Sequence, residues 1–169
     1  TVYCILPVHK GDKHSYLLEC LNSIDRLIIP TNTIFRLCFA IDGDLPTELE
    51  KIVIQYKQNN ANLCRTFYNL KNRGLAKNLN NVIRAIKYDP NIFLMRMDAD
   101  DINEPERLNK QLEFLIQNPS IDVVSSCATK IDEDGNKISY QELYIGKVRP
   151  SKTWVNPIIH PSVLIRSDF

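Results

Sequence analysis

The sequence predicts an α/β fold, a three-layer α/β/α sandwich around a mainly parallel central sheet. Short runs of consecutive apolar residues, typical of strands buried on both faces, alternate with segments whose apolar residues recur at helical spacing. The predicted helices are about 12–15 residues long, a length that joins parallel strands in β-α-β units. The chain has 169 residues and contains no internal repeat or linker, so we expect a single domain over residues 1–169.

The apolar runs define the expected strands in chain order. They cover residues 2–8, 35–41, 63–68, 92–97, 121–131 and 162–165, with a weaker candidate at 137–144 after the turn at Asp134-Gly135. Polar residues rich in carboxylates follow the apolar strands. In parallel sheets, ligands bind beyond the carboxyl ends of the strands, so we expect the ends of the first four strands to share one functional edge.

Helices are predicted between these strands at residues 15–27, from Pro46 onward, at 75–88 and at 104–117. In each segment, apolar residues recur at intervals of three and four and form one apolar face. Thr47 and Glu50 fit a capping box at the start of the second helix.

Composition narrows the classes of partner. Hydrophobic residues make up 44% of the chain and charged residues 24%, which excludes wholesale disorder. Lysine and arginine number 21 against 20 aspartates and glutamates, so nucleic acid is not an expected partner. The longest apolar runs are too short to span a membrane, and we expect a cytoplasmic protein, with the inner face of the membrane as a possible site. The five widely spaced cysteines are predicted to be small buried side chains rather than disulfide or zinc partners.

The segment Asp98-Ala99-Asp100-Asp101, which follows the fourth strand, is the strongest chemical feature. Three carboxylates within four residues repel one another unless a cation lies among them. A divalent metal such as Mn²⁺ or Mg²⁺, held by oxygen ligands, would resolve that repulsion and could neutralise a diphosphate. The alternative is a solvated acidic turn that precedes the next helix.

Two further strand ends are candidates for nucleotide binding. Asp42-Gly43-Asp44 is either a β-turn or a source of a carboxylate for a base or ribose. Residues 71–80 carry Gly74, basic side chains and a helix N-terminus, a combination that suits an anion but also fits a solvated helix start. His160, between Ile159 and Pro161, is either a structural histidine or one that lines the site or binds metal.

The order of these pieces closely resembles that of the family 2 glycosyltransferases, which have the GT-A, Rossmann-like fold of nucleotide-diphospho-sugar transferases. The resemblance covers nearly the whole chain, and its most specific part is Arg96-Met97-Asp98-Ala99-Asp100-Asp101 with the trailing Pro105-Glu106-Arg107-Leu108. Gln111, Asp122-Val123-Val124 and His160-Pro161-Ser162-Val163 follow in the family's order.

The resemblance implies an enzyme that transfers a sugar from a nucleotide-diphospho-sugar, most often a UDP-sugar, to an acceptor hydroxyl with inversion. Its acceptor would be a saccharide or a lipid-linked saccharide, in bacterial surface polysaccharide biosynthesis. The residues that match nucleotide-sugar positions of the family are Pro7, Val8, His9, Asp42, Gly74, Leu75, Lys77, Asp98, Ala99 and Asp100. Asp98 and Asp100 match its metal-binding DXD motif, and His160 is added as a candidate third ligand.

The family's catalytic base has no match in this sequence. In the family it is a carboxylate downstream of the strand that is predicted here at residues 162–165, so we expect it beyond Phe169 and assign no catalytic residue. A non-catalytic nucleotide-sugar-binding module is therefore the alternative from another class. A sugar-phosphate nucleotidyltransferase is a weaker alternative, because the loop after the first strand contains only one glycine, Gly11, rather than a glycine-rich run.

Overall fold

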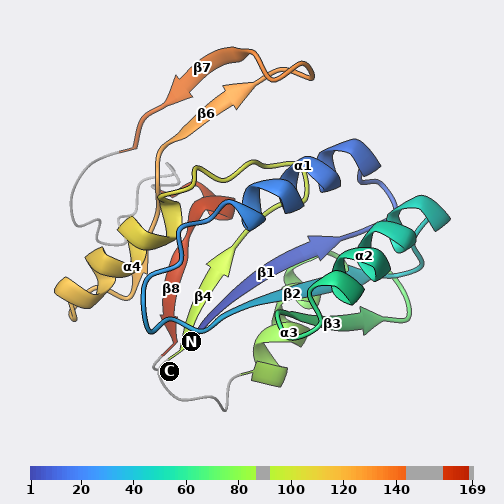
Figure 1. The fold of residues 1–169 in the computed structure, drawn as a ribbon, viewed down its shortest axis with the longest axis horizontal. Coiled ribbons are helices and arrows are strands. Elements are labelled where there is room, and N and C mark those ends of the chain that lie inside the picture. The colour runs from blue at the N-terminus through green and yellow to red at the C-terminus, as the bar shows by residue number, and fades with distance from the viewer. Residues whose placement is uncertain (87–91, 144–157, 168–169) are drawn as a thin grey trace.

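The computed structural model describes residues 1–86, 92–143 and 158–167. Strands and helices alternate along the first two thirds of the chain, as the apolar pattern predicts (Figure 1). The elements are β1 (Val2–Val8), α1 (His14–Asp25), β2 (Phe35–Asp42), α2 (Thr47–Asn59), β3 (Cys64–Asn69), α3 (Leu75–Ile86), β4 (Ile92–Arg96), α4 (Arg107–Gln117), β5 (Val123–Val124), β6 (Ala128–Ile131), β7 (Lys137–Gln141), a 3₁₀ turn η1 (His160–Ser162) and β8 (Leu164–Ser167).

Six of these strands form one sheet in the order β3-β2-β1-β4-β8-β5. The pairs β1–β2, β1–β4 and β2–β3 are parallel, whereas β8 runs antiparallel to both of its neighbours. The prediction of a mainly parallel sheet is confirmed, and β8 makes the sheet mixed.

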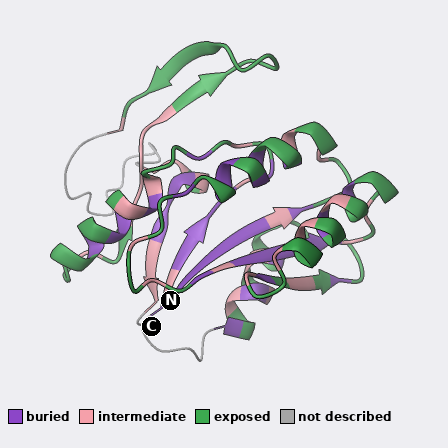
Figure 2. Cartoon of the chain, in the orientation of Figure 1, coloured by how far each residue is buried: buried purple, intermediate pink, exposed green. Residues whose placement is uncertain are grey.

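The two faces of the sheet bury different helices. Along β1, successive side chains alternate between the faces: Cys4 and Leu6 join the core built with α1, α2 and α4, while Tyr3 and Ile5 join the core built with α3. Figure 2 shows the central strands as largely buried between these layers. The three-layer arrangement is therefore confirmed. Within the described residues, α3 is the only helix of the second face.

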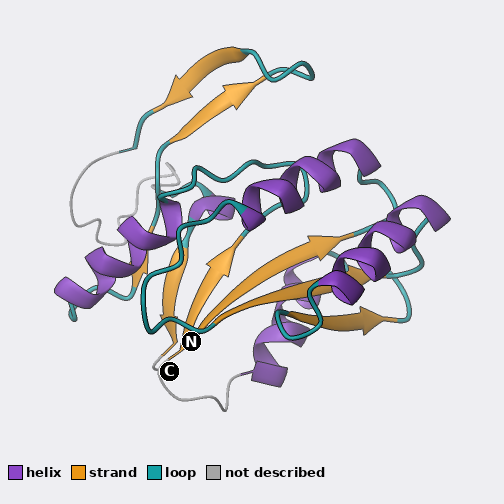
Figure 3. Cartoon of the chain, viewed as in Figure 1, coloured by secondary structure: helices purple, strands orange, loops and turns teal. Residues whose placement is uncertain are grey.

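The predicted strand over residues 121–131 is wrong, because the chain leaves the sheet after Val124. Ser162 accounts for the break: its Oγ accepts a hydrogen bond from the Ser126 amide at 3.0 Å and donates to the Ser126 carbonyl at 3.0 Å. Both main-chain groups of Ser126 are thus taken by a side chain instead of a neighbouring strand. Residues 128–141 form the separate β6–β7 hairpin (Figure 3), and most of its residues are exposed (Figure 2).

Two helix starts also differ from their predictions. The capping box at Thr47 is wrong, because Pro46 occupies the N-cap and Thr47 already lies in the helix, with no side-chain cap bond. The helix predicted from residue 104 begins at Arg107. The predicted ends at residues 87–88 and at 144 lie outside the described residues.

The cysteines are buried largely as expected. Cys4, Cys20, Cys38 and Cys64 are buried and free, and Cys127 is half-buried and free. Burial raises the pKa of Cys4 and of Cys38 to about 12, so both remain protonated thiols at neutral pH. In the described ranges, no helix combines the length and the apolar character that crossing a bilayer requires.

The turn after β2 offers a test of backbone geometry at Gly43. Its φ of 87° lies in the left-handed region, and a Cβ added there would come within 3.0 Å of the Asn72 backbone nitrogen. Gly135 in the β6–β7 turn has a similar φ of 80° but open space around it. We expect Gly43→Ala to lower the free energy of unfolding by about 2–3 kcal/mol and Gly135→Ala by about 1 kcal/mol. Urea denaturation of both variants measures the difference, and equal losses would contradict the close approach.

Candidate functional site

The ends of four parallel strands meet at one edge of the sheet. Val8 at the end of β1 is in register with Ile41 in β2, and Asp42 is in register with Asn69 at the end of β3. β4 runs parallel to β1 (Figure 1), and Asp98 follows two residues after the end of β4 at Arg96. The polar segments that the sequence placed after four separate strands are therefore brought to a common edge, as predicted.

Asp42 has a different set of partners from the predicted base or ribose. Its carboxylate is only 5% exposed. Oδ1 accepts a hydrogen bond from the Arg73 amide at 2.9 Å, and Oδ2 accepts one from the Gly74 amide at 2.9 Å. Asn69 Nδ2 also donates to Oδ1 at 3.1 Å. In this structure both carboxylate oxygens hold the loop that leads into α3.

Two buried asparagines extend this network beneath the loop, and neither is among the predicted site residues. Asn69 Nδ2 donates to Asn78 Oδ1 at 2.9 Å, and Asn78 Nδ2 donates to the Ala40 carbonyl of β2 at 2.7 Å. Asn81 Nδ2 donates to Asn69 Oδ1 at 3.2 Å. The available sequence signal was a polar residue on the inward face of an amphipathic helix, since Asn78 lies three residues after Leu75 and four before Val82.

The start of α3 is exposed beside this network. Gly74 has a φ of 83°, which positions its amide toward Asp42 and lets the chain turn into the helix. Leu75 and Lys77, in the first turn, are exposed at the site edge. The first amides of a helix lack intrahelical acceptors and carry the positive end of its dipole, so this turn can accept an anion.

The end of β1 forms another part of the edge. Val8 is buried, Pro7 is half-buried and His9 is exposed. Asp12 holds His9 in place, because its carboxylate accepts a hydrogen bond from the His9 amide at 2.8 Å and lies 2.8 Å from His9 Nδ1. The imidazole orientation is thus set from within the β1–α1 loop.

The acidic turn after β4 combines exposed and paired carboxylates. Asp98 is half-buried and forms an ion pair with the buried Arg96, whereas Asp100 is exposed. Ala99 is buried between them and so fixes the turn in the core. Burial, together with the nearby charges of Asp100 and Asp98, raises the pKa of Asp101 to about 6. The sequence did not predict that Arg96 offsets part of the acidic charge.

The donor set of this turn fits a hard divalent cation. Aspartate oxygens are the ligands that Mn²⁺ and Mg²⁺ prefer, and these ions commonly complete their coordination with phosphate oxygens and water. Across residues 1–86, 92–143 and 158–167, no three histidine, cysteine, aspartate or glutamate side chains lie close enough to hold an ion together. The structure therefore does not assemble Asp98, Asp100 and His160 into one ligand set, and His160 as a third ligand stays a prediction.

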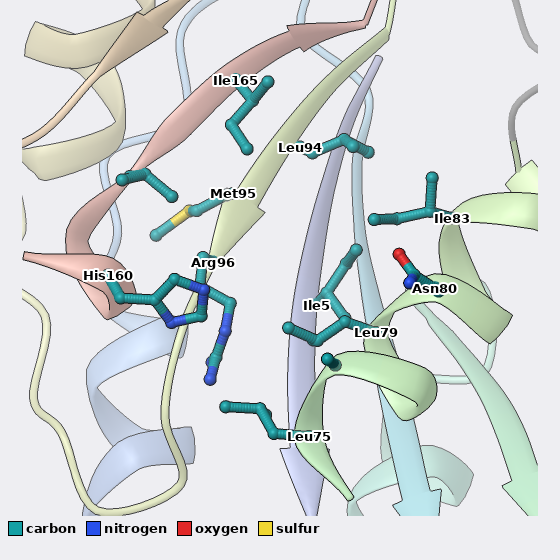
Figure 4. A pocket seen from close by; sticks show the side chains of 12 residues that line it. Ile5, Leu75, Leu79, Asn80, Ile83, Leu94, Met95, Arg96, His160 and Ile165 are labelled. Carbon is teal, nitrogen blue, oxygen red and sulfur yellow. The ribbon is translucent and has the colours of Figure 1, made fainter. Parts of the chain in front are cut away.

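A cavity of about 280 Å³ lies on the face of the sheet that α3 covers, and its lining includes Arg96, the ion-pair partner of Asp98. Figure 4 shows the side chains of Arg96 and His160 on one side of it and those of Ile5, Leu79 and Ile83 on the other. Leu75 lines the same cavity, so the start of α3 and the His160 turn border one space. Its lining is largely apolar, with Arg96 and His160 as the basic groups.

Removal of the Asp42 carboxylate tests its structural role. Asp42→Ala leaves the Arg73 and Gly74 amides without their acceptor and Asn69 Nδ2 with Asn78 Oδ1 alone, and we expect a loss of about 3 kcal/mol in the free energy of unfolding. Asp44→Ala removes an exposed carboxylate two residues away and is expected to cost less than about 0.5 kcal/mol. Chemical denaturation of both variants gives the comparison, and similar losses would contradict the role of Asp42.

Asp101 gives a pH-dependent prediction. Its folded-state pKa of about 6 lies above the ordinary value of 3.8, so the folded protein prefers the protonated acid. The stability that this preference provides is complete below pH 3.8 and is lost as the pH rises to about 6. We therefore expect Asp101→Asn to raise the midpoint of thermal unfolding at pH 8 and to change it little near pH 4. The variant and the unmodified chain are compared in EDTA at each pH. A stabilisation that does not change with pH, or one matched by the exposed-residue control Asp122→Asn, would contradict this assignment.

Comparison with known proteins agrees with this geometry. The model of the family described as Glycosyl transferase family 2 matches residues 3–166. The O-antigen biosynthesis glycosyltransferase WbnJ of Escherichia coli is 28% identical over 168 residues, which cover 97% of this chain and 61% of WbnJ. The chain thus spans less than two thirds of that relative.

Solved structures share the fold at lower identity. Staphylococcus aureus TarS, solved in complex with UDP, aligns over 98% of this chain and 46% of its own, with a TM-score of 0.64 and 19% identity. The mannosyltransferase PcManGT from Pyrobaculum calidifontis, solved with GDP-Man and Mn²⁺, covers 76% of this chain and 35% of its own, with a TM-score of 0.62 and 18% identity. With the family match over nearly its whole length, and a GT-A architecture whose polar strand ends share one edge, this chain belongs to glycosyl transferase family 2.

Proposed function

We propose that this chain binds a nucleotide-diphospho-sugar, with a UDP-sugar as the favoured donor. We also propose that it belongs to an enzyme that transfers the sugar to an acceptor hydroxyl with inversion. The observation that carries this proposal is the position of the Asp98–Asp100 turn at the same sheet edge as the start of α3. Carboxylates for a cation and helix amides for an anion thus lie along one edge, as a metal–diphosphate complex requires.

The nucleotide would lie along the ends of β1, β2 and β3. Pro7, Val8 and His9 would border the base, and the exposed Leu75 and Lys77 would lie beside the diphosphate. Asp42 and Gly74 contribute through the loop that they hold together. A direct contact between Asp42 and the base or ribose would require its carboxylate to exchange at least one of its present partners.

Asp98 and Asp100 would hold Mn²⁺ or Mg²⁺, and Asp98 also has the ribose as a possible partner. When bound, the ion supplies positive charge that neutralises the diphosphate as it leaves. Ala99, which lies between these two residues in the sequence, is buried and anchors the turn in the core. The Mn²⁺ and the GDP-Man in the PcManGT structure support this assignment.

Transfer with inversion is a single displacement. The acceptor oxygen forms a bond to the anomeric carbon, the bond to the diphosphate breaks, and the proton of the acceptor hydroxyl passes to a general base. We assign no residue of the described chain to that base. We propose a saccharide or lipid-linked saccharide as the acceptor. The name of WbnJ, an O-antigen biosynthesis glycosyltransferase, supports a role in surface polysaccharide biosynthesis.

Metal-dependent nucleotide binding tests the proposal. We expect calorimetry to show that UDP binds in Mn²⁺ and much more weakly in EDTA, and that Asp100→Ala weakens binding in Mn²⁺ at least about tenfold. Asp134→Ala, an exposed aspartate in the hairpin turn, is the control and is expected to bind as the unmodified chain does.

Two outcomes would overturn parts of the proposal. Binding of UDP that is equally strong in EDTA, or unchanged in Asp100→Ala, would exclude the metal assignment. Tight binding of UDP-sugar without transfer to any saccharide acceptor, measured with the full-length gene product, would favour a non-catalytic binding module.

A further inference from the structure

Two side chains of α4 connect the acidic turn to the turn that carries His160. Arg107 and Gln111 lie one helical turn apart, and Arg107 Nε lies 3.3 Å from Gln111 Oε1 as a hydrogen-bond donor. Both residues occur in the sequence motif that follows the acidic segment, and the proposed binding of metal and nucleotide leaves them unused. They contact no expected ligand position themselves.

Arg107 joins two segments that are far apart in the sequence. Its Nη2 donates to the Arg96 carbonyl at 2.8 Å and to the Pro161 carbonyl at 3.0 Å. Its Nη1 donates to Asn103 Oδ1 at 2.8 Å. One guanidinium thus fixes the end of β4, the loop that follows the acidic turn and the His160–Ser162 turn.

Gln111 holds the same turn at a second point. Its Nε2 donates to the Ser162 carbonyl at 2.7 Å and to Ser126 Oγ at 2.6 Å. Gln111 is 5% exposed, so these bonds are shielded from water. The turn η1, which precedes β8, is therefore anchored to α4 through consecutive carbonyls, those of Pro161 and Ser162.

The anchored segments carry the candidate metal-site residues. Arg96 directly precedes Met97 and Asp98, and His160 directly precedes Pro161. Arg96 and His160 line the same cavity (Figure 4). A shift of either anchored carbonyl would therefore change the separation between the acidic turn and the imidazole.

An arginine suits this task better than a lysine. Its planar guanidinium offers donors in a fixed fork and can bond to several carbonyls at once, whereas an ammonium group is a single point donor on a flexible stem. Burial lowers the pKa of Arg107, but the arginine side chain remains charged at neutral pH.

We propose that Arg107 and Gln111 are positioning residues for the donor site, which set the placement of the Asp98–Asp100 turn relative to His160. This inference rests on the proposed function, because it assigns the pair to the metal and diphosphate end of that site. The two residues lie one helical turn apart on α4, and each reaches a carbonyl of the His160 turn.

The test compares Arg107→Lys and Gln111→Leu with Arg166→Lys, each made in the full-length protein. Arg166 is a matched control, because it is a half-buried arginine whose side chain also donates to α4, at the Leu115 carbonyl. It lies on β8 and does not contact the His160 turn through this bond. We expect Arg107→Lys and Gln111→Leu to weaken UDP binding in Mn²⁺ about tenfold and to leave UDP binding in EDTA within about twofold of the unmodified protein. Arg166→Lys is expected to change neither.

Hydrogen exchange gives a second readout that needs no ligand. The Arg96 amide donates to the Val163 carbonyl at 3.0 Å and the Ser126 amide to Ser162 Oγ at 3.0 Å. In Arg107→Lys we expect both amides to lose protection together, while the amides of the β1–β2 pair keep theirs.

The two readouts separate the inference from the proposed function. If the unmodified protein shows no Mn²⁺-dependent UDP binding, the proposed function fails, and the positioning role at a donor site fails with it, whatever the exchange pattern. If Mn²⁺-dependent binding is present but Arg107→Lys retains it within twofold, the positioning role alone is overturned. A uniform loss of protection across the sheet would likewise reduce the pair to a general structural role.

Discussion

Parallel pairing of β1 with β2 and β4 is the constraint on which the rest of the structure depends. Burial on both faces of a strand disfavours polar side chains, so the carboxylates and amides of the candidate site lie at the ends of the strands or just after them. Because the strands are parallel, these residues arrive at one edge instead of alternating between two. Asp42, Asn69 and Asp98 come from three different strand ends and share an edge for this reason alone.

Most of the fold follows from local pattern, and the exceptions depend on residues far along the chain. The apolar runs identify β1 to β4, since a run such as Val2–Val8 is explained by burial on both faces. The end of β5 could not be predicted, because the residue that interrupts it, Ser162, lies 36 positions later. The antiparallel direction of β8 likewise depends on where the preceding segment re-enters the sheet, which no local pattern encodes.

The candidate site divides in the same way. The acidic segment was evident from its own composition, since Asp98, Asp100 and Asp101 are adjacent in the sequence. The partners that shape the site were not, because the contacts of Asp42 with Arg73 and Gly74 span more than thirty residues. The sequence pattern of a carboxylate at a strand end is the same whether the carboxylate binds a ligand or holds a loop. Only the three-dimensional contacts distinguish the two roles.

The buried cysteines provide the molecule with internal probes of its own opening. Cys4 and Cys20 belong to the core beneath α1, whereas Cys38 belongs to the core beneath α3. A thiol reagent in solution reaches the half-buried Cys127 without unfolding of the protein. It reaches the cysteines beneath α1, or the cysteine beneath α3, only when the helices on that face separate from the sheet. The order in which the thiols are labelled would therefore report whether the two layers of helices detach together or one after the other.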